Sequence, residues 1–258
     1  SNEIVSARAH ILAENITKWG NPNVIVTNNT PIAFSKLPSF FDVLVVDAPC
    51  SGEGMFRKDP QAIAEWSVQN VQQCSIRQKT ILRDVWDSLK DGGVLVYSTC
   101  TYNREENEDN VAWACRELGA ECLKMDTKRF EGIVETTYEY RFYPHKMKGE
   151  GFFIAVLRKL ASGIGSKSEK YKRKKSTDQF ADKSGAYKAD IIDADNYVIR
   201  EANQQVMAFN RKHYVDYQAL NARLNCLLNG VQLAEMKGRD FIPAHHFALS
   251  KIINRDSF

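Results

Sequence analysis

Two cysteines in this chain each follow an apolar segment that has the pattern of a buried β-strand. Asp47 and Cys50 come soon after the largely apolar run 42–46, and Cys100 follows the run 94–97. A lone free cysteine is most often a small buried residue, and for Cys50 alone this interpretation is favoured. Two thiols and one carboxyl at the same edge of a sheet would instead form a reactive site, because a thiolate is a strong nucleophile.

Methylation of cytosine at C5 is a reaction that such a set would suit. Cytosine C5 is a poor nucleophile until a thiolate adds to C6, after which C5 can take a methyl group. A base then removes the C5 proton and the thiol leaves. One thiol would attack and the other would help to release the product. The carboxyl group would hydrogen-bond the ring nitrogen or the amino group of the base and so stabilise the adduct.

The surrounding pattern predicts the elements that would position these residues. Apolar runs predict buried strands at 23–27, 42–46 and 94–97, and antiparallel strands at 138–143 and 151–157. Helices are expected at 4–19, which Gly20 can end, at 71–89, closed by Asp91-Gly92-Gly93, and from Asn103 to about 118, with Glu106 as capping-box partner of Asn103. Strands that alternate with helices predict a doubly wound α/β sheet, in which ligands sit at the carboxyl ends of the strands.

Three motifs resemble those of the Sun/Nop-type RNA 5-methylcytosine methyltransferases. The segment from Asp47 to Pro60 resembles the fourth motif of that family, and Ser98 to Glu108 resembles the sixth. Gly151-Phe152-Phe153 resembles the motif on its last strand. The likeness is strongest to the bacterial RsmF-like ribosomal RNA branch. It implies a Rossmann-like S-adenosylmethionine methyltransferase sheet with a smaller C-terminal α+β domain.

The resemblance also implies catalytic roles for three residues. Cys100, in the Thr-Cys-Thr position, would be the nucleophile that forms a covalent adduct with C6 of cytosine in RNA. Cys50, in the Pro-Cys position, would assist release of the methylated RNA. Asp47 would contact the cytosine and lie near the methyl donor. Arg57 and Lys58 follow the catalytic loop that contains Cys50 and would contact RNA phosphates, although a solvated pair of loop charges is the alternative.

S-adenosyl-L-methionine is the implied cofactor, with Glu3, Thr30, Asp47 and Pro49 as its contacts. Glu3 would bind the ribose hydroxyls, because a carboxylate can accept two hydroxyl hydrogen bonds. An acid at the N-terminus of a helix is an equally good interpretation of Glu3. Thr30 stands where family members usually carry an acid near the adenine, which puts that contact in question.

The glycine-rich cofactor loop of the family, and the central strand that carries it, would lie before Ser1. A sheet without its central strand would expose unpaired backbone and apolar faces. We therefore expect residues 1–160 to form a partial catalytic domain. Residues 161–190 are rich in Lys, Ser and Gly and predict a basic flexible linker. Residues 191–258 would form an RNA-binding accessory domain, which is either complete here or continues beyond Phe258.

Composition sets broad limits on the function. Hydrophobic residues make up 43% of the 258 residues, and the net charge of +3 permits a polyanionic partner such as RNA without requiring one. No apolar run approaches a membrane span, and nothing in the sequence calls for an obligate protein partner. The six cysteines form no Cys-x-x-Cys pair, so neither a disulfide framework nor a metal site is expected. Free thiols favour a cytoplasmic protein.

Two other functions remain open from the sequence. A DNA cytosine-5 methyltransferase would attack through Cys50 and would leave the thiol of Cys100 without a role. A non-catalytic RNA-binding fragment would account for the missing cofactor loop.

Overall fold

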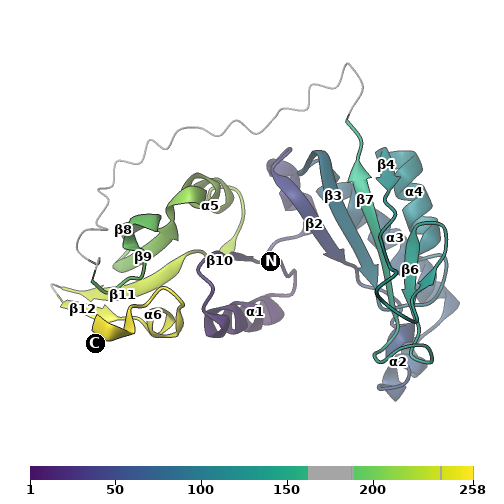
Figure 1. Ribbon diagram of the computed structural model, residues 1–258, viewed down its shortest axis with the longest axis horizontal. Coiled ribbons are helices and arrows are strands. Elements are labelled where there is room, and N and C mark those ends of the chain that lie inside the picture. The colour runs from purple at the N-terminus through teal and green to yellow at the C-terminus, as the bar shows by residue number, and fades with distance from the viewer. Residues whose placement is uncertain (162–186, 188, 239, 258) are drawn as a thin grey trace. The chain divides into compact units, whose positions relative to one another are not determined.

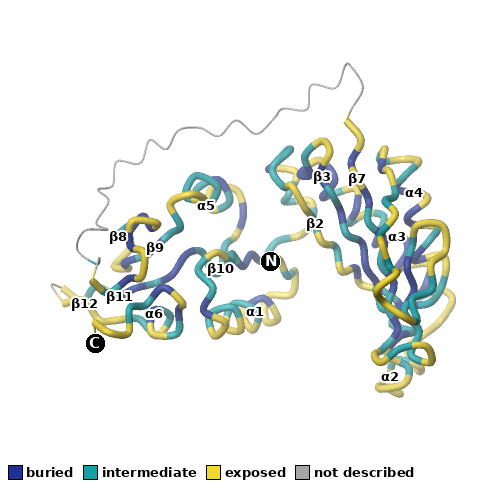
Figure 2. Tube along the Cα trace, in the orientation of Figure 1, coloured by how far each residue is buried: buried dark blue, intermediate teal, exposed yellow. Residues whose placement is uncertain are grey.

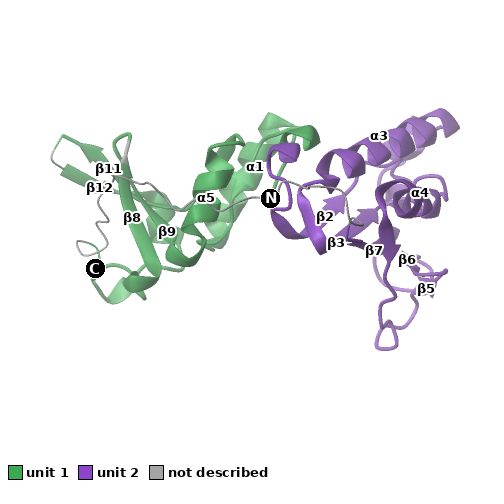
Figure 3. Ribbon diagram, turned by 90° about the horizontal axis from the view of Figure 1, so that it is seen from above, with its two compact units in different colours: residues 1–33, 172–258 green, residues 34–171 purple. Residues whose placement is uncertain are grey.

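A computed structural model describes residues 1–161, 187, 189–238 and 240–257 of the chain. These residues form two compact units, which Figure 3 shows in different colours. One unit spans residues 34–171, and the other combines residues 1–33 with 172–258. The predicted basic linker, 161–190, falls largely outside the described residues. Within the described part of the chain, no helix is long and apolar enough to cross a membrane.

The unit of residues 34–171 is built on a mixed sheet (Figure 1). Its strands are β2 (Phe41–Asp47), β3 (Leu89–Thr99), β4 (Ala120–Cys122), β5 (Val134–Glu135), β6 (Glu139–Phe142) and β7 (Phe152–Lys159). The order is β2-β3-β7-β6-β5, and β4 also pairs with β7. β2 and β3 run parallel, whereas β7 is antiparallel to β3, β4 and β6. The predicted α/β sheet is therefore present, and the strands predicted at 138–143 and 151–157 correspond to β6 and β7, which pair antiparallel.

Two long helices, α3 (Val68–Trp86) and α4 (Glu108–Leu118), contact each other beside this sheet, and a short helix, α2 (Pro60–Glu65), precedes them. Side chains from α3, α4, β3 and β7 share one core, which includes Leu82, Trp86, Leu95, Tyr97, Val111, Phe153 and Leu157. α3 begins earlier than predicted, because the Ser67 side chain accepts a hydrogen bond from Asn70 N. It also ends earlier, and the glycines that were expected to close it lie within β3.

β2 forms one edge of the sheet, and β3 is its pairing partner among the described residues. Val43 and Val45 on this strand are 56% and 69% exposed, and Figure 2 shows the strand largely uncovered. Apolar side chains and the backbone edge of β2 are therefore exposed among the described residues.

The other unit contains a separate antiparallel sheet of order β12-β11-β9-β8. Its elements are β8 (Tyr197–Ala202), β9 (Gln205–Asn210), α5 (Tyr214–Asn221), β10 (Cys226–Leu228), β11 (Val231–Lys237), β12 (Asp240–Pro243) and α6 (His245–Leu249). Its core includes Ile199, Val206, Ala208, Val231, Leu233 and Phe247. This antiparallel sheet is thus separate from the mixed sheet of residues 34–171.

Residues 1–33 join this second unit rather than the six-stranded sheet. Helix α1 (Ser6–Trp19) ends at Gly20, as predicted, and is followed by the short strand β1 (Val26–Thr27). The sequence placed 23–27 among the alternating strands and helices of the catalytic sheet, but β1 pairs antiparallel with β10. A β-branched run predicts that a strand is buried, yet it does not determine which strand becomes its partner.

Candidate active site

The parallel pairing of β2 with β3 brings the ends of these strands together. Asp47, the last residue of β2, is in register with Ser98 near the end of β3. Ala48 N donates to Ser98 O over 2.9 Å, and Ser98 Oγ donates to Asp47 Oδ1 over 3.1 Å. The two loops that follow these strands therefore start side by side.

Cys50 and Cys100 meet where these loops run next to each other. Their Sγ atoms lie 3.1 Å apart, and Cys100 N donates to Cys50 Sγ over 3.3 Å. Gly54 N also donates to Cys100 O over 2.7 Å, which holds the first loop against the second. A Cβ at Gly54 would lie 2.6 Å from that carbonyl oxygen, so only glycine fits this approach. Both cysteines are half-buried.

The contact between the sulfurs makes the two thiols unequal. A hydrogen bond from Cys50 lowers the pKa of Cys100 to about 7, against the opposing effects of burial and of the Asp47 and Glu106 charges. The same bond, with burial and the charge of Cys100, raises the pKa of Cys50. Near neutral pH the pair can therefore hold a thiolate at Cys100 and a neutral thiol at Cys50.

A buried polar network underlies the two loops. The Glu106 carboxylate accepts hydrogen bonds from Ser51 N, Gln78 Nε2 and Asn103 Nδ2. Sequence reasoning made Glu106 a capping-box partner, and Asn103 Oδ1 does accept from Glu106 N. The Glu106 side chain, however, turns to the loop of Cys50, and α4 begins only at Glu108. Gln78 was not identified from the sequence, where nothing distinguishes it from other helix glutamines.

Arg57 and Lys58 both face one acidic side chain. Arg57 Nη2 lies 2.9 Å from Glu150 Oε1 and also donates to Gly149 O. Lys58 Nζ lies 3.2 Å from the same carboxylate oxygen. The two cations lower the pKa of Glu150, and its Oε2 atom is buried without a hydrogen-bond partner. The predicted RNA contacts therefore share a counter-ion that the sequence did not reveal.

The residues predicted to contact the cofactor divide between the two units. Pro49 is exposed beside Cys50, with its carbonyl accepting from Gln78, and Asp47 is exposed at the end of β2. Glu3 and Thr30 belong to the unit that contains residues 1–33. Glu3 Oε1 accepts from Val5 N at the start of α1, as in the alternative interpretation of this residue.

Glu3 still has capacity for a ligand. Its Oε2 atom lies 2.9 Å from Arg8 Nη2, but Arg8 is 71% exposed, and exposed ion pairs of this kind are weak and readily exchanged. Each carboxylate oxygen can also accept a second hydrogen bond. The two acceptor oxygens of Glu3 therefore fit the hydroxyls of a ribose diol.

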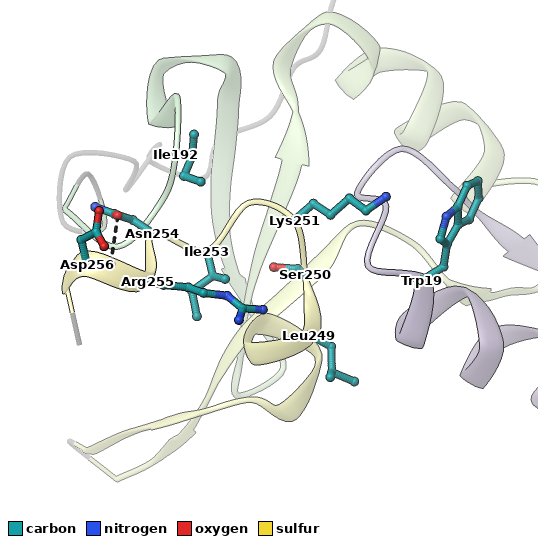
Figure 4. Close-up of a pocket in the computed structure, with 9 residues that line it drawn as sticks. All are labelled: Trp19, Ile192, Leu249, Ser250, Lys251, Ile253, Asn254, Arg255 and Asp256. Carbon is teal, nitrogen blue, oxygen red and sulfur yellow. Dashed lines mark hydrogen bonds between the residues drawn. The ribbon is translucent and has the colours of Figure 1, made fainter.

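A pocket of about 520 Å³ lies in the unit that contains α6 (Figure 4). Trp19, Ile192 and the segment 249–251 and 253–256 line it. In Figure 4 the side chain of Lys251 extends toward the Trp19 indole. Lys251 Nζ lies 5.6 Å from the centre of that ring. None of the predicted catalytic residues lines this pocket.

Fold and site together define an α/β protein with two cysteine thiols in contact beyond the carboxyl ends of its parallel strands β2 and β3. The chain belongs to the family described as 16S rRNA methyltransferase RsmB/F, whose model matches residues 1–158. This confirms the family predicted from the motifs.

Curated relatives carry the name ribosomal RNA small subunit methyltransferase F. The protein of Cronobacter sakazakii is 40% identical over 168 residues, which cover 63% of this chain and 35% of that protein. The protein of Enterobacter sp. (strain 638) is 30% identical over 273 residues, which cover 100% of this chain and 55% of that protein. The chain thus spans about a third to just over half of the length of these relatives.

Two solved structures from Pyrococcus horikoshii are similar in fold. NSun6, solved with SFG, matches with a TM-score of 0.52 and 29% identity, and the match covers 62% of this chain and 41% of that one. A methyltransferase homolog protein matches with a TM-score of 0.52 and 28% identity, covering 62% of this chain and 52% of that one.

Proposed function

We propose that this chain carries the base-modifying part of an S-adenosylmethionine-dependent RNA cytosine-5 methyltransferase that acts on ribosomal RNA. The observation that carries this proposal is the 3.1 Å contact between the sulfur atoms of Cys50 and Cys100 in the loops that follow β2 and β3. The RsmB/F family assignment supports the substrate class. The sheet is accordingly interpreted as part of a Rossmann-like methyltransferase fold.

The reaction begins when the Cys100 thiolate forms a bond to C6 of the target cytosine, which must leave its base stack to reach the sulfur. The electron pair of the C5–C6 double bond shifts onto C5 and is delocalised through C4 to N3, which makes C5 nucleophilic. Asp47 stabilises this adduct by hydrogen bonding to the base. S-adenosylmethionine supplies the methyl group that C5 takes. Asp47 and Pro49, which lie in the same unit as the two cysteines, would hold that cofactor there.

Cys50 changes its role once the adduct has formed. Two causes of its raised pKa are the hydrogen bond with Cys100 and the negative charge of that partner. Both depend on a Cys100 thiolate, and a thioether at Cys100 carries no charge. Cys50 can then lose its proton to solvent more easily, and the resulting thiolate acts as the base that takes the C5 proton. The electrons of the C5–H bond restore the double bond, and the bond from Cys100 to C6 breaks.

Arg57 and Lys58 are proposed to contact RNA phosphates beside this site. Their shared partner, Glu150, holds both cations close together. Residues 191–258 are proposed to be an accessory RNA-binding region.

Trapping of covalent adducts tests the proposed chemistry. Cys50→Ala and Cys100→Ala variants are incubated with S-adenosylmethionine and either a small-subunit ribosomal RNA fragment or a DNA of the same sequence. We expect a denaturation-resistant protein–RNA species with Cys50→Ala and none with Cys100→Ala. Cys74→Ala, which changes a buried cysteine outside the pair, is the control and should behave as the unaltered chain.

Other outcomes would assign a different function. An adduct that requires Cys50 and forms only on DNA would identify a DNA cytosine methyltransferase. Binding of RNA without any adduct, together with no heat of S-adenosylmethionine binding in calorimetry, would leave a non-catalytic RNA-binding role.

A further inference from the structure

The peptide groups on both sides of Cys50 are held by two fully buried side chains. Gln78 Nε2, on α3, donates to Pro49 O over 2.9 Å, and Ser51 N donates to Glu106 Oε2 over 3.1 Å. Gln78 Nε2 also donates to Glu106 Oε2 over 2.6 Å, which joins the two holding groups. Both side chains are 0% exposed. These hydrogen bonds thus hold the backbone at Cys50 in place without a bound substrate.

The same carboxylate reaches the loop of Cys100. Asn103 Nδ2 donates to Glu106 Oε1 over 2.7 Å and to Thr101 Oγ1 over 2.8 Å. The hydroxyls of Ser51 and Thr101, the residues that follow the two cysteines, lie 3.0 Å apart. Glu106 therefore connects the chain at Cys50 with the chain at Cys100.

Gln78 has its own orientation fixed by other buried groups. Asn110 Nδ2 donates to Gln78 Oε1 over 2.7 Å, and Tyr97 Oη donates to the same oxygen over 3.1 Å. The amide nitrogen of Gln78 must then face Glu106 and Pro49. Because every side-chain contact of Glu106 is a donor, only a group with two acceptor oxygens satisfies this position.

Electrostatics alone does not account for this buried carboxylate. Burial of a carboxylate without a cation is costly, and no cation contacts Glu106 among the described residues. Its charge raises the pKa of Cys100, which opposes formation of the nucleophile, whereas the hydrogen bond from Cys50 lowers that pKa more strongly. If Glu106 promotes formation of the Cys100 thiolate, it must therefore do so through the position in which it holds Cys50.

We propose that Glu106, aided by Gln78, is a positioning residue that keeps the Cys50 thiol within hydrogen-bonding distance of Cys100. This inference rests on the proposed function of the cysteine pair. It adds to that function a reason why the pKa of Cys100 stays low before a cytosine is bound.

The pH profile of Cys100 alkylation tests the proposal on the whole chain. Iodoacetamide labelling at a series of pH values is read at Cys100 by peptide mass spectrometry. In Glu106→Gln, an amide nitrogen would face Gln78 or Asn103, both of which present donors. We expect the midpoint of the profile to rise from about 7 towards 9.0, because Cys50 moves away. Glu105→Gln, in the same loop but exposed, is the control and should leave the midpoint unchanged.

The competing explanations give other results. If Glu106 acted only through its charge, the midpoint would fall in Glu106→Gln; if it were merely structural, the midpoint would stay at its original value. Either result overturns the proposal. Gln78→Leu keeps the carboxylate but removes the donor to Pro49, and it should also raise the midpoint, so it decides the matter if Glu106→Gln does not fold.

Labelling needs neither RNA nor S-adenosylmethionine. A raised midpoint in a protein that fails to form an RNA adduct would therefore reject the proposed function and leave the positioning role intact. A normal midpoint in Glu106→Gln, with adducts formed as expected, would do the reverse.

Discussion

Cys50 and Cys100 are 50 positions apart in the sequence, yet their sulfur atoms lie 3.1 Å apart. The register of β2 and β3 explains this contact, because Asp47 pairs with Ser98 and each cysteine follows shortly afterwards. A thiol that donates to a thiolate stabilises its charge and fixes its direction. The pair thus combines an activated sulfur with a neutral partner at one edge of the sheet.

Cys50→Ala should make Cys100 less reactive near neutral pH. Without the hydrogen bond from Cys50, the pKa of Cys100 should rise from about 7 towards 9.0. The thiolate fraction at pH 7 would then fall from about one half to about one in a hundred. Iodoacetamide labelling against pH, read at Cys100, measures the change, with Cys74→Ala as control. A midpoint that stays near 7 would show that Cys50 does not activate its neighbour.

The ion pair between Arg141 and Glu108 should be important for stability. Arg141 Nε lies 2.6 Å from Glu108 Oε1, the side chains are 9% and 16% exposed, and Arg141 Nη1 also donates to Tyr102 O beside Cys100. Arg141→Met leaves a buried carboxylate without its partner, so we expect a loss of about 3 kcal/mol in the free energy of unfolding. Urea denaturation measures this loss.

Arg104→Met is the matched control for that change. The Arg104 pair with Asp109 is exposed, at 79% and 48%, and should contribute less than about 1 kcal/mol. Equal losses in the two variants would contradict the importance of burial.

Gly20→Ala should disturb the contact between α1 and α6. Gly20 has a φ of 73°, and a Cβ there would lie 2.3 Å from Leu249 O, while Lys251 N donates to Gly20 O. Backbone strain and this clash should together cost about 2–3 kcal/mol. Hydrogen exchange should increase in peptides from both helices.

Gly119→Ala is the control that separates the cost of backbone strain from the cost of a steric clash. Gly119 has a φ of 65° at the end of α4, but a Cβ there would meet no atom within 4 Å. Only the cost of the left-handed backbone, about 1 kcal/mol, is expected. If Gly20→Ala lost no more free energy of unfolding than Gly119→Ala, a clash between the new Cβ and Leu249 O would be ruled out.

Glu150→Gln should strengthen RNA binding. The change removes the carboxylate charge that Arg57 and Lys58 share, so both cations become available to phosphates. The slope of log affinity against log salt should steepen by about one. Fluorescence anisotropy with labelled RNA at several salt concentrations measures both effects, with the exposed Glu131→Gln as control. Unchanged affinity would mean that these cations do not contact the RNA.

Much of the local structure could be predicted from the sequence. The apolar runs 42–46 and 94–97 correspond to β2 and to part of β3. The prediction that 42–46 is a buried strand was wrong, since Val43 and Val45 are exposed; an apolar run does not show that its strand lies at the edge of a sheet. Gly20 ends α1 because its left-handed conformation favours glycine. The capping box at Asn103 was only half right, since its local pattern does not show where the Glu106 side chain goes.

The sequence by itself determined the family, the two cysteines and the sheet edge at which they lie, because motifs and strand patterns are properties of short segments. Only the tertiary structure decided that Cys50 touches Cys100, that Glu106 and Gln78 hold the chain at Cys50, and that β1 pairs with β10. These contacts join residues far apart in the chain. A hydrogen bond or a shifted pKa depends on distance and burial, and both exist only once the chain has folded.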